Sequence, residues 1–167
     1  MTDIVIRRAR AEDLDALLGL YNHYVANTHV TFDVEPRTRE QRKAWLDGFS
    51  EGGRRQCFVA AKGSVAIGWA SSGPFKDRAA YDTSVETSVY LAPDEGGKGH
   101  GRRLYQTLLD ALATEDVHRA FGGIAQPNEA SVGLHLALGY RHVGTYSEVG
   151  RKFGKFWDVA WYEKALG

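Results

Sequence analysis

The feature that most constrains this chain is a run of four glycines in six positions, "GGKGHG" at residues 96–101. Glycine loses more conformational freedom on folding than any other residue, so such a cluster needs a structural reason. The residues that follow have leucines at helical spacing, Leu104, Leu108, Leu109 and Leu112. A glycine-rich turn at the start of a helix is either simply tight or lets a ligand approach the main chain closely.

Two common phosphate-binding patterns do not fit this loop. A dinucleotide-binding G-x-G-x-x-G turn starting at Gly97 would need its third glycine at Arg102. A Walker loop would use Gly97 and Lys98, but Gly99 stands where Ser or Thr should hold magnesium. A third possibility is a strand-to-helix loop whose consecutive amides, from Gly97 to Arg102, face a pyrophosphate at the positive end of the helix. From the residues alone, a flexible turn explains the glycines equally well.

Bulk properties narrow the class of protein. The 167 residues contain no internal repeat, low-complexity tract or long linker, so we expect a single domain over residues 1–167. Lys plus Arg and Asp plus Glu both total 21, which argues against nucleic acid or an anionic membrane as the main partner. Cys57 is the sole cysteine and lies in the apolar run "CFVAA", which indicates a buried, inert thiol and a reducing cytoplasm. No leader-like or membrane-length apolar segment is evident, so we expect a cytoplasmic protein.

Periodicity predicts a mixed α/β fold. Strands are expected over 3–9, at two places within 56–72, and over 82–92, 119–125, 141–150 and 155–166. Helices are expected over 12–26 and 38–49, after the glycines, and over 128–140 with a stop at Gly139. Thr38 with Gln41 predicts a capping box at the second helix. Strands come first as a run and later alternate with helices, which predicts a mixed sheet covered on both faces.

The strand over 82–92 contains a carboxylate at its centre. Alternation places Val85, Thr87, Val89 and Leu91 on one face and Glu86, Ser88 and Tyr90 on the other. A carboxylate among β-branched residues is costly if it is buried without a partner. The residues alone therefore favour an exposed or salt-bridged strand face for Glu86.

The predicted helix over 128–140 starts at Asn128, a preferred N-cap. His135 lies one turn beyond Ser131. A lone helical histidine usually packs or faces solvent without a chemical role, and the residues alone favour that reading. The other histidines show no metal-ligand spacing, so we expect no metal site.

Several segments resemble one family. "GGKGHG" matches the acetyl-CoA loop [QR]-x-x-G-x-[GA] of the GNAT N-acetyltransferases at Gly99 and Gly101, and departs from it at Gly96. "NEASVGLHLALGY" is similar to the family's N-x-x-[AS]-x-x-L-[YH]-x-x-x-G-[FY] segment. "YNHYVANTHVTFDVEP", "AYDTSVETSVYL" and "KFGKFWDV" resemble the phosphinothricin acetyltransferase branch. The resemblance implies the GNAT fold, a mixed and mostly antiparallel sheet of about six to seven strands flanked by about four helices.

The resemblance also implies an activity. The protein would transfer acetyl from acetyl-CoA to the primary amine of a small amino-acid-like acceptor, of the phosphinothricin or methionine sulfoximine type, by direct attack in a ternary complex. It would work as a homodimer. Glu86 would be the general base, and His135 would act as an acid, a second base or a contact to pantetheine. "FWD" stands where herbicide-resistance enzymes have "WHD", so the acceptor's identity stays open.

The implied binding residues fall into two groups. Those for the coenzyme are Val89, Tyr90, Leu91, Gly97, Lys98, Gly99, His100, Gly101, Arg102, Asn128 and Ser131. If the strand separates from its neighbour after Leu91, backbone groups of Val89, Tyr90 and Leu91 would be free to pair with pantetheine amides. Those for the acceptor are Phe75, Lys76, Arg78 and Tyr81, with Lys152 and Lys155 as further candidates.

Three other functions stay open. The chain could be a non-catalytic acyl-CoA-binding or sensor domain that keeps the loop without the chemistry. It could be a nucleotide-binding module that uses the glycines for ATP or NAD. It could also be an acyltransferase that uses another acyl group or acts on another amine, including one on a protein.

Overall fold

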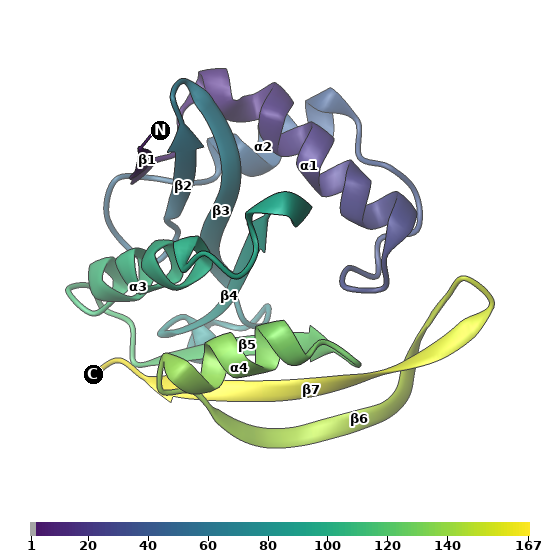
Figure 1. Cartoon of the computed structure of the whole chain (residues 1–167). Coiled ribbons are helices and arrows are strands. Elements are labelled where there is room, and N and C mark those ends of the chain that lie inside the picture. Colours follow the sequence, from purple (N-terminus) through teal and green to yellow (C-terminus); the bar gives the residue numbers. More distant parts are fainter. Residues whose placement is uncertain (1–2) are drawn as a thin grey trace.

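One twisted sheet organises the molecule. The computed structural model describes residues 3–167, and seven strands in this range pair in the order β1-β2-β3-β4-β5-β7-β6 (Figure 1). The strands are β1 (Ile4–Arg8), β2 (Cys57–Lys62), β3 (Val65–Pro74), β4 (Ser84–Leu91), β5 (Arg119–Ala125), β6 (Arg141–Lys152) and β7 (Lys155–Ala165). Only β4 and β5 are parallel, and the other neighbouring pairs are antiparallel. The predicted mixed, mostly antiparallel sheet is confirmed.

Four α-helices are present in the described residues: α1 (Leu14–Asn27), α2 (Arg39–Asp47), α3 (His100–Leu112) and α4 (Glu129–Ala137). The order of helices and strands is the predicted one. The expected capping box is also present, because the Thr38 side chain accepts from the Gln41 amide while the Gln41 side chain accepts from the Thr38 amide. None of the helices within residues 3–167 is both long and apolar enough to cross a membrane.

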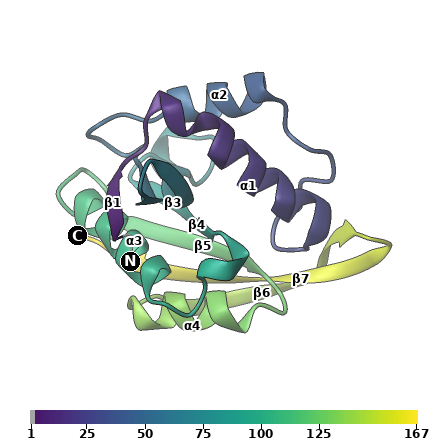
Figure 2. The same ribbon diagram turned by 45° about the horizontal axis from the view of Figure 1, so that its top comes forward.

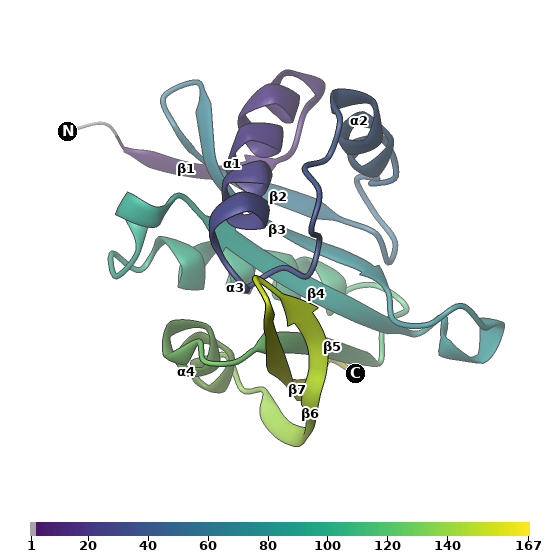
Figure 3. The same cartoon turned by 90° about the vertical axis from the view of Figure 1, so that its right-hand side faces the viewer.

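The helices cover both faces of the sheet (Figures 1 and 3). On one face α1 and α2 bury Leu17 and Leu46 against Trp69 of β3. On the other face the leucine stripe of α3 packs on the central strands together with residues of α4, and Leu104 and Leu108 are fully enclosed. Burial of these apolar side chains is the main favourable term that holds the layers together.

The strands β4 and β5 run together only briefly. They pair at Ser84–Glu86 against Arg119–Phe121, and then they separate. The opening therefore begins after Glu86, and the expectation that the strand separates after Leu91 was wrong. Side chains explain the difference. The Thr87 hydroxyl donates to the Phe121 carbonyl at 3.3 Å and also contacts the hydroxyls of the buried Tyr105 and Tyr140. These side-chain contacts occupy the place where the backbone hydrogen bonds between β4 and β5 would continue.

The β6–β7 hairpin reaches the loop that follows α1 (Figure 2). There the buried Lys152 Nζ donates to the Thr31 carbonyl at 2.8 Å. The His29 ring stacks on Trp157 with centroids 4.3 Å apart. Lys152 is thus committed to a structural contact, whereas Lys155 is exposed at the start of β7.

Candidate active site

A cavity of about 420 Å³ occupies the gap where β4 and β5 separate. It is lined by the second half of β4, the glycine loop, the end of β5 and the first turns of α4. Most of the residues predicted to bind the coenzyme or to act on it line this cavity. They are Val89, Tyr90, Leu91, Gly97, Gly99, Gly101, Arg102, Asn128, Ser131 and His135. Segments 46 positions apart along the chain, from Val89 to His135, thus meet around one space.

The glycine loop presents its backbone to this cavity. Gly97 and Gly99 have φ angles of 75° and 80°, in the left-handed region that favours glycine. A methyl group at either position would meet nothing within 4 Å, so the main chain there borders open space. Gly99 is the N-cap of α3 and offers no side-chain cap to the amides of the first turn. Uncapped amides and the positive helix end form a site suited to an anion such as a pyrophosphate.

Two residues predicted for coenzyme binding point elsewhere. Lys98 Nζ lies 3.0 Å from Glu95 Oε2, and His100 Nε2 lies 3.8 Å from the same oxygen. The hydrogen bond from Lys98 lowers the pKa of Glu95, so this carboxylate stays ionised. Neither Lys98 nor His100 lines the cavity. Their side chains approach the buried Glu95 carboxylate instead.

The histidine of α4 is buried and fully hydrogen-bonded. Asn128 Oδ1 accepts from the Ser131 amide at 3.2 Å, which caps the helix. His135 Nδ1 donates to the Ser131 carbonyl at 2.7 Å, so Nε2 carries no proton and accepts from the Tyr105 hydroxyl at 3.1 Å. Burial lowers the pKa of His135, which is therefore a neutral imidazole at pH 7.

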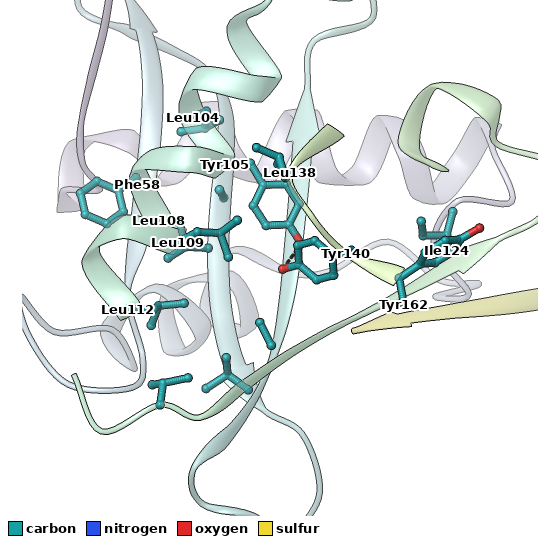
Figure 4. Packing of buried hydrophobic residues seen from close by; sticks show 14 of the residues in the cluster. Phe58, Leu104, Tyr105, Leu108, Leu109, Leu112, Ile124, Leu138, Tyr140 and Tyr162 are labelled. Atoms are coloured by element: carbon teal, nitrogen blue, oxygen red, sulfur yellow. Dashed lines mark hydrogen bonds between the residues drawn. The ribbon is translucent and has the colours of Figure 1, made fainter. Parts of the chain in front are cut away.

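Behind His135 lies a buried hydroxyl network. The Thr87 hydroxyl is 2.5 Å from the Tyr105 hydroxyl and 2.7 Å from that of Tyr140. The hydroxyls of the two tyrosines lie 3.0 Å apart (Figure 4). Burial raises the pKa of Tyr105 well above its usual value and that of Tyr140 to about 12. Sequence reasoning missed these residues. The one available signal was a tyrosine hydroxyl within the leucine-rich face of α3.

Glu86 projects from β4 on the same face as Ser88. It is half-buried, and its carboxylate forms no hydrogen bond or ion pair with another residue of the described range. Its register neighbours are Gly73 on β3 and Phe121 on β5. Burial without a compensating partner raises the pKa of the Glu86 carboxyl. A raised pKa makes a carboxylate a better proton acceptor.

The predicted acceptor loop lies beside this strand. The Phe75 ring stacks on Phe121 at 4.2 Å, and Lys76 Nζ lies 5.4 Å and 5.6 Å from the Phe75 and Tyr81 ring centroids. Lys76 and Tyr81 line a small cavity of about 220 Å³. Arg78 is exposed and lines neither that cavity nor the one at the glycine loop. The structure therefore brings Phe75 close to the strand of Glu86, and it leaves Arg78 in solvent.

A second cavity, of about 350 Å³, opens on the face covered by α1 and α2. It shares Ser88 and Tyr90 with the cavity at the glycine loop. Glu86 lines neither cavity, and it precedes Ser88, which lines both, by two residues on the same face of β4.

Neither a cluster of metal-ligating side chains nor a thiol nucleophile is evident in the part of the chain that the structure describes. No three His, Cys, Asp or Glu side chains gather there as a metal site. Cys57 is 3% exposed, and burial raises the pKa of its thiol to about 12. It is therefore a thiol at neutral pH and is enclosed by the core under α1.

Comparison with known proteins identifies the family. Residues 6–161 match the model of the acetyltransferase (GNAT) domain. A phosphinothricin N-acetyltransferase of Streptomyces coelicolor is 55% identical over 166 residues, which cover 98% of this chain and 97% of that protein. A methionine sulfoximine/methionine sulfone acetyltransferase of Pseudomonas paraeruginosa is 32% identical, over 96% of this chain and 94% of that protein.

A solved structure shows the same fold. The GNAT phosphinothricin acetyltransferase of Sinorhizobium meliloti in complex with acetyl-CoA superposes with a TM-score of 0.93 at 29% identity, over 100% of this chain and 90% of that one. The predicted family, fold and enzyme class are confirmed. The chain therefore belongs to the GNAT family and is an acetyl-CoA-dependent N-acetyltransferase.

Proposed function

We propose that the acceptor is a small amino-acid-like molecule of the phosphinothricin or methionine sulfoximine type, acetylated on its primary amine by direct attack in a ternary complex. The observation that carries this proposal is the arrangement along β4. A cavity with an anion-binding loop at one end shares Ser88 with a second cavity, and Glu86 lies on the same strand face. The names of the relatives from Streptomyces coelicolor and Pseudomonas paraeruginosa support the acceptor class.

The glycine loop would hold the donor. The amides that follow Gly97 and Gly99 at the start of α3 would bind the diphosphate of the coenzyme, with Arg102 at the rim of the cavity. Backbone groups of β4 from Val89 to Leu91, released from β5, would pair with the pantetheine amides. One N–H of this segment would donate to the oxyanion that forms when the thioester carbonyl is attacked. The bound coenzyme supplies the activated acetyl group.

Glu86 would act as the general base. An α-ammonium group has a pKa of about 7.7–8.0, so a positioned carboxylate with a raised pKa can accept its proton, directly or through a water. The neutral amine then forms the new C–N bond at the thioester carbonyl. The resulting oxyanion collapses as the C–S bond breaks, and the surplus proton on the nitrogen neutralises the departing thiolate. Cys57 does not serve as an acyl carrier in this scheme, because its thiol is buried and protonated.

His135 would touch the coenzyme near its sulfur end rather than donate a proton directly. Its Nδ1–H is engaged by the Ser131 carbonyl, and its Nε2 accepts from Tyr105. Donation to the departing thiolate would first require a charged imidazole, which burial disfavours. These observations favour a contact and positioning role over that of an acid or a second base.

The proposal is tested with Glu86→Gln and a panel of amines, assayed by release of free thiol from acetyl-CoA. We expect the wild type to acetylate phosphinothricin or L-methionine sulfone, and we expect Glu86→Gln to lower kcat/KM by about 10²–10⁴-fold. Binding of acetyl-CoA, measured by calorimetry, should be unchanged. Turnover that is equal in both proteins would remove Glu86 from the mechanism. Failure of every amino-acid-like amine would overturn the acceptor class.

We also infer a homodimer, one domain over residues 1–167, and a cytoplasmic location. Strand β6 is an edge of the sheet, and the hairpin that it forms with β7 carries exposed apolar side chains, Val143, Tyr146, Val149, Phe153 and Phe156. Such an apolar edge suits burial against a second copy. The single sheet from Ile4 to Ala165 supports one domain, and the lone reduced thiol supports a cytoplasmic setting. Light scattering coupled to gel filtration tests the dimer.

A further inference from the structure

A buried arginine without an acidic partner lies in the second cavity. Arg42 of α2 is 5% exposed, and its guanidinium is enclosed by aromatic rings, 3.4 Å from the Trp45 centroid and 4.6 Å from those of Tyr21 and Trp69. Its Nε and Nη2 are fully buried and have no hydrogen-bond partner among the described residues. The side chain lines the cavity, and it forms no ion pair with any residue in the described range.

The aromatic rings alone do not balance this charge. Burying a cation is costly unless it is paired, although contact with ring faces recovers part of the cost. Asp33 is the one acidic residue that lines the cavity, and it is already engaged by Arg37 at 2.7 Å and by the Tyr21 hydroxyl. Burial lowers the pKa of Arg42 to about 10, so the group still carries its charge at neutral pH. The cavity is left with one uncompensated positive charge.

The same cavity offers hydroxyl groups for an anion. Ser71 on β3 and Ser88 on β4 are register partners, and both line it. Neither hydroxyl has a hydrogen-bond partner among residues 3–167. A guanidinium with adjacent hydroxyls is a combination that recognises carboxylates.

We propose that this cavity is the subsite for the carboxylate of the acceptor, bound by Arg42 and by the hydroxyls of Ser71 and Ser88. This inference rests on the proposed function. It places the carboxylate of the substrate between α2 and the centre of the sheet, and not at the exposed loop that contains Arg78.

The position of the subsite fits the chemistry of an α-amino acid. Ser88 and Glu86 are two residues apart on one strand face, a separation of about 6.6 Å along the strand. In an α-amino acid a single carbon separates the carboxylate from the amine. Ser88 lines both cavities and Glu86 lines neither, so a carboxylate bound next to Ser88 would place the amine on the part of β4 that leads from the cavities to Glu86.

The test compares L-methionine sulfone with its carboxamide, which keeps the amine and loses the charge. We expect Arg42→Met to lower the ratio of kcat/KM for the acid to kcat/KM for the amide by about 10- to 100-fold. Arg42→Lys, which keeps the charge, should recover part of this ratio. Arg39→Met is the matched control, because Arg39 lies on the same helix, is exposed, and pairs with Asp15 at 2.8 Å. A ratio that Arg42→Met leaves unchanged would overturn the proposal.

A second variant and a direct binding measurement cover the case in which Arg42→Met does not fold. Ser71→Ala removes one hydroxyl from the cavity, and it should lower the same ratio by about threefold to tenfold. In the wild type, L-methionine sulfone but not its carboxamide should shift the NMR signal of the Arg42 Nε–H. Such a shift without acetylation would reject the proposed function and keep the subsite. Acetylation with no shift and no effect of Ser71→Ala would reject the subsite and keep the proposed function.

Discussion

Gly122 of β5 and His135 of α4 face each other so closely that a single methyl group on the strand would collide with the imidazole. A Cβ at position 122 would lie 2.7 Å from His135 Nε2 and 3.0 Å from Cδ2. The missing side chain at Gly122 thus leaves room for the His135 ring in the position where it accepts from Tyr105. The position of His135 depends on a residue that is 13 positions away and that carries no functional group.

The first prediction concerns this contact. Gly122→Ala should displace the His135 ring and break its hydrogen bond from Tyr105, which lowers kcat by about tenfold or more because a small misplacement of a site residue is costly. Stability should fall by about 1–3 kcal/mol through overpacking. Gly133→Ala on α4 is the control, since a methyl group there meets nothing within 4 Å. Equal kinetics for the two variants would argue against a functional position for His135.

The second prediction is the charge state of His135. Nitrogen chemical shifts from NMR should show a neutral ring with the proton on Nδ1, as its bond to the Ser131 carbonyl requires. Its folded-state pKa lies below the ordinary value of about 6.5, so the unfolded chain binds the proton first as the pH falls. The stability due to the neutral ring is present above pH of about 6.5 and is lost as the pH falls toward the folded-state pKa. His135→Asn lacks this titrating group, so its free energy of unfolding should fall less than that of the wild type between pH 7.5 and pH 5.5.

The third prediction concerns the stability cost of Glu86. Burial raises its folded-state pKa, so the ionised carboxylate opposes folding at neutral pH. Glu86→Gln should raise the free energy of unfolding at pH 8 while it abolishes most of the activity. Most carboxyls have a lower pKa in the folded state and stabilise the fold as the pH rises, whereas Glu86 has a higher one and does the opposite. Its penalty is absent below the unfolded pKa of about 4.3, and it grows as the pH rises from there to the folded-state pKa. Urea denaturation at pH 8 and pH 5 should show a smaller gain at pH 5, and a gain that is constant with pH would contradict the assignment.

The fourth prediction separates backbone strain from ligand binding. Gly99→Ala and Gly53→Ala each place a side chain at a φ of about 80°, where an L residue loses about 1–2 kcal/mol, and each added methyl meets nothing within 4 Å. Both variants should lose similar stability. Only Gly99→Ala should weaken binding of acetyl-CoA, by about tenfold, because the amides at the start of α3 shift from their positions. Calorimetric titration checks this, and equal affinities in the two variants would remove the glycine loop from the binding site.

Local pattern was sufficient for much of this protein. The order of helices and strands, the capping box at Thr38, the leucine stripe of α3, and the alternation that places Glu86 and Ser88 on one face follow from neighbours in the sequence. These features are readable because helices and strands impose fixed periods on the side chains that must be buried. The glycine loop belongs to the same group, since its spacing limits what it can bind.

Tertiary structure alone decided how these elements form a site. The sequence does not reveal that β4 and β5 separate after Glu86, because the separation depends on Thr87 meeting Tyr105 and Tyr140 from other elements. Likewise, nothing local marks Gly122 as room for His135, or Arg42 as a cation enclosed by rings from three elements. Periodicity reports which face of an element is buried, whereas partners across the fold depend on how those faces pack, and packing is a property of the whole chain.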